Sequence, residues 1–243
     1  LHQTNLAQIA ALRQSNAELD AFAHTVAHDL KNPLTNLQLY ADIVQRQLSA
    51  DDDPTLVRGM RHIVENAARM GRIMEALLLL SGVRRQQVAL APLNMAQIVE
   101  QAQQRLQIQA QAAKADIYLP SAWPTAVGYA PWVEEIWYNY LSNGLKYGGR
   151  PCRLELGATA VDTPHLGASY IRFWVRDNGP GVYPEIQHTL FEEFTQLTPE
   201  QRDGYGLGLS IVRRIATKLG GHVGFETAVG KGSLFYFTLP ATT

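Results

Sequence analysis

The chain has little cysteine, almost no net charge and no long apolar segment. Cys152 is the one cysteine among its 243 residues, which excludes a disulfide framework and a cysteine-based metal site. The formal net charge is −1, so charge gives no reason to expect binding to nucleic acid or to an anionic membrane surface. The apolar run at residues 76–80 is far shorter than the roughly 20 residues of a membrane-spanning helix. What remains is a chain long enough for one large domain or two small ones.

Apolar residues recur in steps of three and four along the first part of the chain. This seam runs from Ile9 to Val44 with Asn16 as a polar member, and it predicts a long helix with a coiled-coil face. With Ile9 at heptad position a, His28 falls at position f, farthest from the seam. We therefore expect His28 to face solvent on a stiff helix. Taken alone, such a histidine is an ordinary surface residue.

The residues after His28 favour a chemical role for it. Asp29 is able to accept a hydrogen bond from one imidazole nitrogen, which leaves the other nitrogen as a nucleophile. Asn32 is near enough to position a water beside the ring, and Pro33 is expected to bend the helix. His24 has no acidic residue directly after it and ranks behind His28.

A second helix with similar spacing follows a polar turn. Residues 49–54 break the pattern, Asp53 or Thr55 is a candidate N-cap, and apolar steps resume from Leu56 to Leu77. Two such helices form an antiparallel hairpin that leaves apolar surface exposed. Pairing with a second copy into a dimeric four-helix bundle would cover it.

The periodicity changes after Gly82, which predicts a hairpin domain over residues 1–83, a linker over 84–90 and a second domain over 91–243. In the second domain strands and helices interleave, and several strands are joined as hairpins. The expected fold is α+β in two domains, the second being an α/β sandwich with a mixed sheet and helices on one face. We expect helices near residues 94–112, 131–147 and 211–219, and strands near residues 88–93, 117–119, 126–129, 153–161, 170–176, 222–227 and 233–239. Asn94 is a candidate N-cap of the first of these helices, and the last is expected to end at Gly220-Gly221.

Four candidate site residues lie on the helix expected at residues 131–147. Asn139 and Asn143 are four apart, so their carbonyl oxygens project from one face, and such hard oxygen ligands suit Mg²⁺. Lys146 and Tyr147 follow within a turn, and the lysine can pair with a phosphate. In isolation the two asparagines read as ordinary surface amides.

The sequence Asp177-Asn178-Gly179-Pro180-Gly181 directly follows an expected strand. A carboxylate at a strand end can accept a hydrogen bond from an exocyclic amino group such as that of adenine. Glycines beside it let the backbone approach a flat ring. The plain alternative is a turn, since these are the usual turn residues.

A second glycine run, Gly204-Tyr205-Gly206-Leu207-Gly208, leads into the last expected helix. Glycines before a helix N-terminus offer N–H groups and the positive end of the helix dipole to phosphate. The run does not end in Gly-Lys-Ser/Thr and no βαβ unit follows, which excludes a P-loop and a Rossmann fingerprint.

Residues 185–203, between the two glycine runs, have the composition of an active-site lid. Their second half is polar and contains proline, and the run ends at glycines that provide a hinge. Phe191 and Phe194 are expected to pack in the stem of this lid.

In this order the motifs resemble the transmitter region of sensor histidine kinases, from about Ala21 to Leu239. Residues 27–34 resemble the phosphoacceptor box, and the glycine motifs resemble the Bergerat-type ATP-binding domain shared with gyrase, the Hsp90 chaperones and mismatch-repair ATPases. The resemblance implies a protein histidine kinase that uses ATP and Mg²⁺ to phosphorylate itself and then a response regulator receiver domain. It implies a homodimer fed by an upstream sensor domain, with no nucleic-acid partner. We expect this chain to be a cytoplasmic fragment, of a full-length protein either membrane-attached or soluble.

The resemblance also assigns roles to residues. His28 resembles the phosphoacceptor, Asp29 its general base, and Asn32 the residue that orients water when such proteins dephosphorylate their partner. Asn143 resembles the main Mg²⁺ ligand, with Asn139 assisting. Further nucleotide-binding positions are Lys146, Tyr147, Asp177 as the adenine reader, Gly179, Gly181, Gly204, and Gly206, Leu207 and Gly208 as the phosphate cradle.

Two positions bear on the alternatives. Relatives that hydrolyse ATP carry a glutamate where this chain has Asn139, which cannot take a proton, so transfer to histidine is favoured over a gyrase- or chaperone-like ATPase. Gly144 stands where the family usually has alanine. A signalling scaffold with a vestigial nucleotide site is the other alternative, and the intact Asn143 and Asp177 argue against it.

Overall fold

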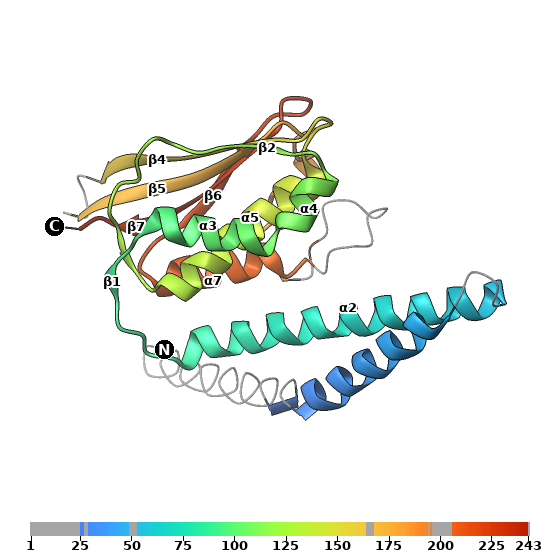
Figure 1. Ribbon diagram of the computed structural model, residues 1–243. Helices are drawn as coiled ribbons and strands as arrows, with labels where there is room; N and C mark the ends of the chain where they lie inside the picture. Colours follow the sequence, from blue (N-terminus) through green and yellow to red (C-terminus); the bar gives the residue numbers. More distant parts are fainter. Residues whose placement is uncertain are drawn as a thin grey trace, which may run out of the picture. The chain divides into compact units, whose positions relative to one another are not determined.

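The computed structural model describes residues 25–26, 29–48, 53–163, 168–193, 195 and 206–242. The chain divides into two compact units, residues 1–85 and 86–243, which are described separately (Figure 1). Within the described residues, every helix is too short or too polar to cross a lipid bilayer.

The first unit contains two antiparallel helices. Residues 29–47 are helical, and the helix continues through Pro33. The second helix, α2, spans Pro54–Arg85, and Asp53 caps it, since Asp53 Oδ1 accepts a 2.8 Å hydrogen bond from the Thr55 N–H. This confirms Asp53 as the cap, with Pro54 in the first turn, where a missing N–H costs nothing.

The first helix contacts α2 through residues that lie off its apolar seam, whereas α2 contributes two residues of its own apolar repeat. Leu34, Ala67 and Met74 form the buried cluster between them, and Gln38 Nε2 donates a 3.0 Å hydrogen bond to the Ala67 carbonyl. The described seam residues of the first helix stay on the surface of the single chain; Leu37, for example, is 47% exposed. The hairpin therefore closes without burying this part of the first helix's seam.

The second unit is organised on a five-stranded sheet with strand order β2-β4-β5-β7-β6. β2 is parallel to β4, and all other neighbours are antiparallel, so the predicted mixed sheet is confirmed. A separate two-stranded pair joins β1 to β3. The strands are β1 Ala91–Pro92, β2 Asp116–Tyr118, β3 Val127–Gly128, β4 Arg153–Thr163, β5 Ala168–Asp177, β6 Val223–Thr227 and β7 Ser233–Pro240.

The longer helices of this unit cover one face of the sheet, as predicted (Figure 1). Trp137 of α5 is fully buried and meets Phe173 of β5 and Phe237 of β7 edge to face, with ring centroids 6.3 and 5.4 Å apart. This aromatic cluster joins helix layer and sheet. The helices are α3 Met95–Arg105, α4 Gln107–Ala112, α5 Ala130–Tyr147, α6 Pro184–Gln187 and α7 Gly208–Lys218.

Two elements differ from their predictions. The strand expected at residues 88–93 is only the two-residue β1, and the helix expected at residues 94–112 is broken at Leu106. Leu106 is 2% exposed, and its N–H turns to a 3.0 Å bond with the Gln103 carbonyl, so burial of this leucine coincides with the tightened turn that ends α3. The Asn94 cap is confirmed, because its side chain accepts from the Gln97 N–H at 3.3 Å.

Candidate functional site

Asp177, the last residue of β5, is held by backbone N–H groups from two parts of the chain. Its Oδ1 accepts hydrogen bonds from Gly179 at 2.8 Å and from Ser233 at 3.3 Å. Ser233 arrives there because Arg176 pairs with Leu234 across β5 and β7. Both bonds use the same oxygen, so the geometry leaves Oδ2 as the oxygen to offer to a ligand.

Burial raises the pKa of the Asp177 carboxyl above its ordinary value, and the N–H groups of Gly179 and Ser233 oppose that rise. The Asp177 carboxyl is therefore partly shielded from water, and the two N–H groups fix its orientation. A desolvated acceptor discriminates strongly, because a partner that lacks a donor leaves it unsatisfied.

A cavity of about 260 Å³ opens beside Asp177 in the second unit. Five predicted nucleotide-site residues line it: Asn143, Lys146, Tyr147, Asp177 and Gly181. The remaining lining residues are Gly148, Arg150, Pro180, Val182, Tyr183, Ile186, Ser233 and Phe235. Apolar and backbone surface with one oriented carboxylate is the lining expected for a flat heterocycle.

The glycines of the first motif are required by close backbone contacts. A Cβ on Gly179 would lie 2.3 Å from the Tyr147 carbonyl oxygen. Gly181 has φ +77°, and a Cβ there would lie 2.4 Å from the Ala228 carbonyl oxygen. A residue with a side chain at either position would clash with this backbone. An ordinary turn does not require such close contacts, so a turn alone does not explain both glycines.

A second group of predicted residues meets where α5 faces the start of α7. Asn139 Nδ2 donates to the Glu135 carbonyl at 2.8 Å, and its Oδ1 points at Gly208, where a Cβ would be only 2.5 Å away. Gly206, with φ +64°, and the buried Leu207 lead into this helix N-terminus. None of these four residues is among those that line the cavity, although Asn139 lies on α5, the helix that also carries the lining residue Asn143.

The amide oxygens on α5 are suitable ligands for a hard cation. The described residues contain no group of three or more His, Cys, Asp or Glu side chains that could hold a metal. Asn139 and Asn143 lie one turn apart, and the bond to Glu135 fixes which atom of the Asn139 amide faces α7. Two amide oxygens with substrate oxygens and water are a donor set that fits Mg²⁺.

The hairpin residues are partly outside the described chain. Asp29 and Asn32 are exposed on the helix of residues 29–47. His28, Gly204 and Phe194 lie outside the described residues, as does the part of the expected lid from residue 196 to 203. Phe191, in the part of that segment that is described, packs against Phe225 with ring centroids 6.2 Å apart.

Sequence reasoning missed several of the residues that line the cavity, among them Ser233, Phe235, Arg150 and Tyr183. Ser233 and Phe235 reach it through strand pairing with β5, for which the sequence holds no local signal. Arg150 and Tyr183 lie just beyond the recognised motifs, and only their proximity to Tyr147 and Gly181 could have drawn attention to them.

Two family models match the chain in tandem. Residues 18–85 match the His Kinase A (phospho-acceptor) domain, and residues 128–243 match the histidine kinase-, DNA gyrase B- and HSP90-like ATPase family. The order agrees with that read from the motifs.

Curated relatives match the chain over nearly its whole length. The methanogenesis regulatory histidine kinase FilI of Methanothrix harundinacea is 31% identical over 96% of this chain and 26% of its own length. Cyanobacterial phytochrome B of Nostoc is 29% identical over 94% of this chain and 30% of its own length. The chain thus spans less than a third of these relatives.

Solved structures agree on the fold. Full-length ShkA in complex with AMPPNP superposes with a TM-score of 0.72 at 25% identity, over 92% of this chain and 46% of that one. The histidine kinase AdeS of Acinetobacter baumannii gives a TM-score of 0.57 at 21% identity, over 89% of this chain and 98% of that one.

The chain belongs to the histidine kinase family. It carries the transmitter region of a sensor histidine kinase, in which a phosphoacceptor helical region is followed by an ATP-binding α/β domain.

Proposed function

We propose that this transmitter region binds ATP beside Asp177 and transfers the γ-phosphoryl group to His28, from which it passes to an aspartate of a response regulator. We assign residues 1–83 to the phosphoacceptor hairpin, 84–90 to the linker and 91–243 to the catalytic domain. The observation that carries the proposal is the half-buried Asp177 carboxylate, fixed through Oδ1 at the wall of the cavity.

The adenine end of the site follows from hydrogen-bond chemistry. Asp177 Oδ2 accepts from the exocyclic amino group, and the glycines at positions 179 and 181 allow the ring to lie against backbone. Guanine presents a carbonyl oxygen at the same position, which would face the carboxylate without a donor. The site therefore selects an adenine nucleotide.

The phosphate end lies toward Asn143, Asn139 and the start of α7. The first N–H groups of α7 and the positive end of its dipole favour anionic oxygens, and Gly206, Leu207 and Gly208 form the backbone of the cradle. Asn143 and Asn139 would hold Mg²⁺, which neutralises phosphate charge when bound. Lys146 adds a cation near the same oxygens.

Transfer requires a free imidazole nitrogen on His28. Asp29 accepts the hydrogen bond from the other ring nitrogen, and so fixes the tautomer and takes up the proton as the N–P bond forms and the γ-phosphate bond to ADP breaks. Asn32 takes no part in this transfer. Its role is to orient water when the protein dephosphorylates its regulator.

The partners follow from the uncovered surface of the hairpin. Leu37 and Met70, 47% and 52% exposed in the single chain, are covered by a second copy in a four-helix bundle. The receiver domain docks beside His28, where its aspartate meets the phosphohistidine.

The test is transfer of label from γ-labelled ATP into the purified chain. His28→Gln should abolish acid-labile labelling, while His24→Gln, the neighbouring histidine, should retain it. Undiminished labelling of the His28 variant would remove that residue from its role. Asn143→Asp should lose Mg²⁺-dependent ADP binding by calorimetry, and retained affinity would contradict the metal assignment.

A further inference from the structure

Asn178 fastens the loop that follows α5 to the end of β5. Its Oδ1 accepts hydrogen bonds from the N–H groups of Gly149 at 3.1 Å and Arg153 at 2.9 Å, and its Nδ2 donates to the Pro151 carbonyl at 2.8 Å. Three bonds from one side chain span five residues of this loop. They bring the loop to the neighbour of Asp177, at the base end of the cavity.

The backbone of this loop is also closely packed at two glycines. A Cβ on Gly148 would lie 2.3 Å from the Gly144 carbonyl oxygen, and one on Gly149 would lie 2.4 Å from the Asn178 carbonyl oxygen. Backbone packed this closely cannot shift without displacing α5 or the Asp177 turn. The side chain that the loop carries into the cavity, Arg150, is therefore attached to a rigid base.

Arg150 and Tyr183 are cavity-lining side chains with large exposed surfaces. Arg150 is exposed, and Tyr183 is 55% exposed at the residue before α6. Neither has a hydrogen bond, ion pair or ring contact with a described residue through its side chain. A structural role would leave such a pair with partners in the protein.

We propose that the Arg150 guanidinium and the Tyr183 ring form the outer wall of the base pocket and contact the purine of the bound nucleotide, with Asn178 as the residue that positions Arg150. The proposal deepens the proposed function and rests on it. Guanidinium and phenol both present flat faces, and a cation or aromatic ring over a heterocycle adds attraction beyond buried area.

Arg150 also supplies a guanidinium that only donates hydrogen bonds, which complements Asp177. Asp177 only accepts, and adenine carries ring nitrogens that accept on both sides of its amino group. A donor-only side chain fixed beside Asp177 complements those nitrogens. Arg150 and Asp177 therefore contact the base, whereas Lys146 and the start of α7 contact the phosphates.

The experiment compares ADP with adenosine, which lacks phosphate. Arg150→Ala should weaken binding of both ligands by the same factor, about tenfold or about 1.4 kcal/mol, and Tyr183→Ala should behave alike. Arg150→Lys keeps the charge but loses the planar fork, so it should recover little. Tyr183→Phe keeps the ring and should bind like wild type.

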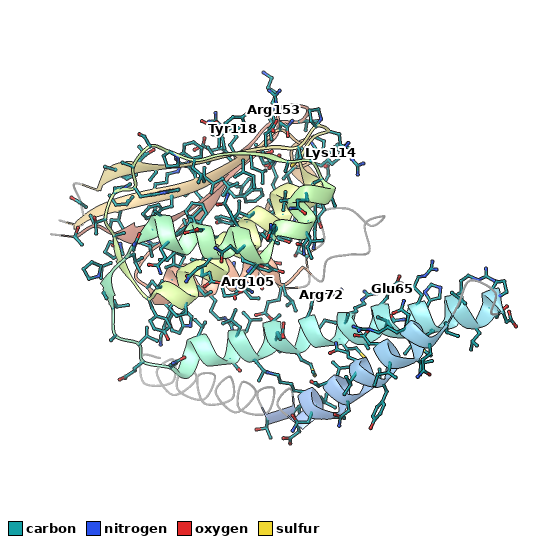
Figure 2. All side chains as sticks on the ribbon, in the orientation of Figure 1. Glu65, Arg72, Arg105, Lys114, Tyr118 and Arg153 are labelled. Atoms are coloured by element: carbon teal, nitrogen blue, oxygen red, sulfur yellow. The ribbon has the colours of Figure 1, made fainter. Side chains whose placement is uncertain are left out.

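Arg153→Ala is the matched control. Arg153, labelled in Figure 2, is the first residue of β4, directly after the loop, and it is not among the residues that line the cavity. A loss seen with ADP alone would put the guanidinium at the phosphates and overturn the proposal, as would unchanged affinity for both ligands. Failure of wild type to bind ADP would instead refute the proposed function itself.

Asn178→Ala tests the positioning role. It should weaken adenosine binding in the wild-type background and add little in the Arg150→Ala background, because the contact it supports is already gone. Equal losses in both backgrounds would show that Asn178 acts on the fold alone, and thermal unfolding of each variant measures that contribution separately.

Discussion

Replacing Asp177 by asparagine should separate nucleotide binding from stability. Asparagine has the same shape and keeps an oxygen acceptor. Gly179 and Ser233 both donate to that oxygen, so the amide is forced to place its oxygen at Oδ1 and its NH₂ group at Oδ2. The ligand-facing acceptor thereby becomes a donor.

The cost to binding follows from the lost hydrogen bond. A hydrogen bond to a charged group contributes about 1.5–3 kcal/mol. Its loss corresponds to a dissociation constant that is roughly 10- to 150-fold larger. Two donors facing each other add to this loss. We therefore expect Asp177→Asn to lie at or beyond the upper end of that range for ADP.

The effect on stability has the opposite sign. Burial raises the pKa of Asp177, so the fold favours the neutral carboxyl. Its stabilising contribution is present below the pKa of the unfolded chain, about 4, and is lost as pH rises through the higher pKa of the folded state. At neutral pH the variant, which is always neutral, should be as stable as wild type or more stable.

Thermal unfolding over a pH series, together with calorimetry of ADP binding, measures both effects. The difference in melting temperature between variant and wild type should grow as pH rises from about 4 toward neutrality. Asp177→Ala is the control, because it orphans both N–H donors and should destabilise by about 1–3 kcal/mol for each. Wild-type affinity in Asp177→Asn, or a melting temperature that falls relative to wild type with rising pH, would refute the reasoning.

Three further substitutions test the fold. Gly232 has φ +80°, and a Cβ there would lie 2.0 Å from the Asp177 carbonyl oxygen, so Gly232→Ala should lower the free energy of unfolding strongly. Gly220→Ala is the control, because Gly220 shares the positive φ but its nearest contact would be at 3.8 Å, and denaturant unfolding should show a much smaller loss for it. Leu37→Asp should dissociate the dimer in sedimentation while Leu39→Asp, also exposed but off the seam, should not. Trp137→Ala should cost about 3–5 kcal/mol by chemical denaturation, because the ring is fully buried at the centre of the aromatic cluster.

Local signals predicted much of the fold. The caps at Asp53 and Asn94 were predicted because a short polar side chain before an apolar repeat satisfies the first N–H groups of a helix. The end of α7 was predicted because Gly220, at φ +81°, adopts a conformation that other residues resist. These features depend on residues within one turn of each other.

Features that depend on distant residues were not predicted. The break at Leu106 coincides with burial of that side chain, which a helical repeat cannot reveal. Ser233 reaches Asp177 across 56 residues, through the register of β7 on β5. The contact line Leu34–Gln38 in the hairpin differs from the apolar seam, because one helix face serves the chain itself and another remains exposed.

The two stripes of α5 explain why the site is rigid. Ile136, Trp137, Tyr140 and Leu141 are buried, with Trp137 and Tyr140 in contact with the sheet, while Asn139 and Asn143 are half-buried on the adjoining face. On a helix these stripes turn together, so rotation that moved the asparagines would also pull Trp137 out of its aromatic contacts. The packing that stabilises the domain therefore also fixes the spacing between the proposed metal-binding amides and Asp177.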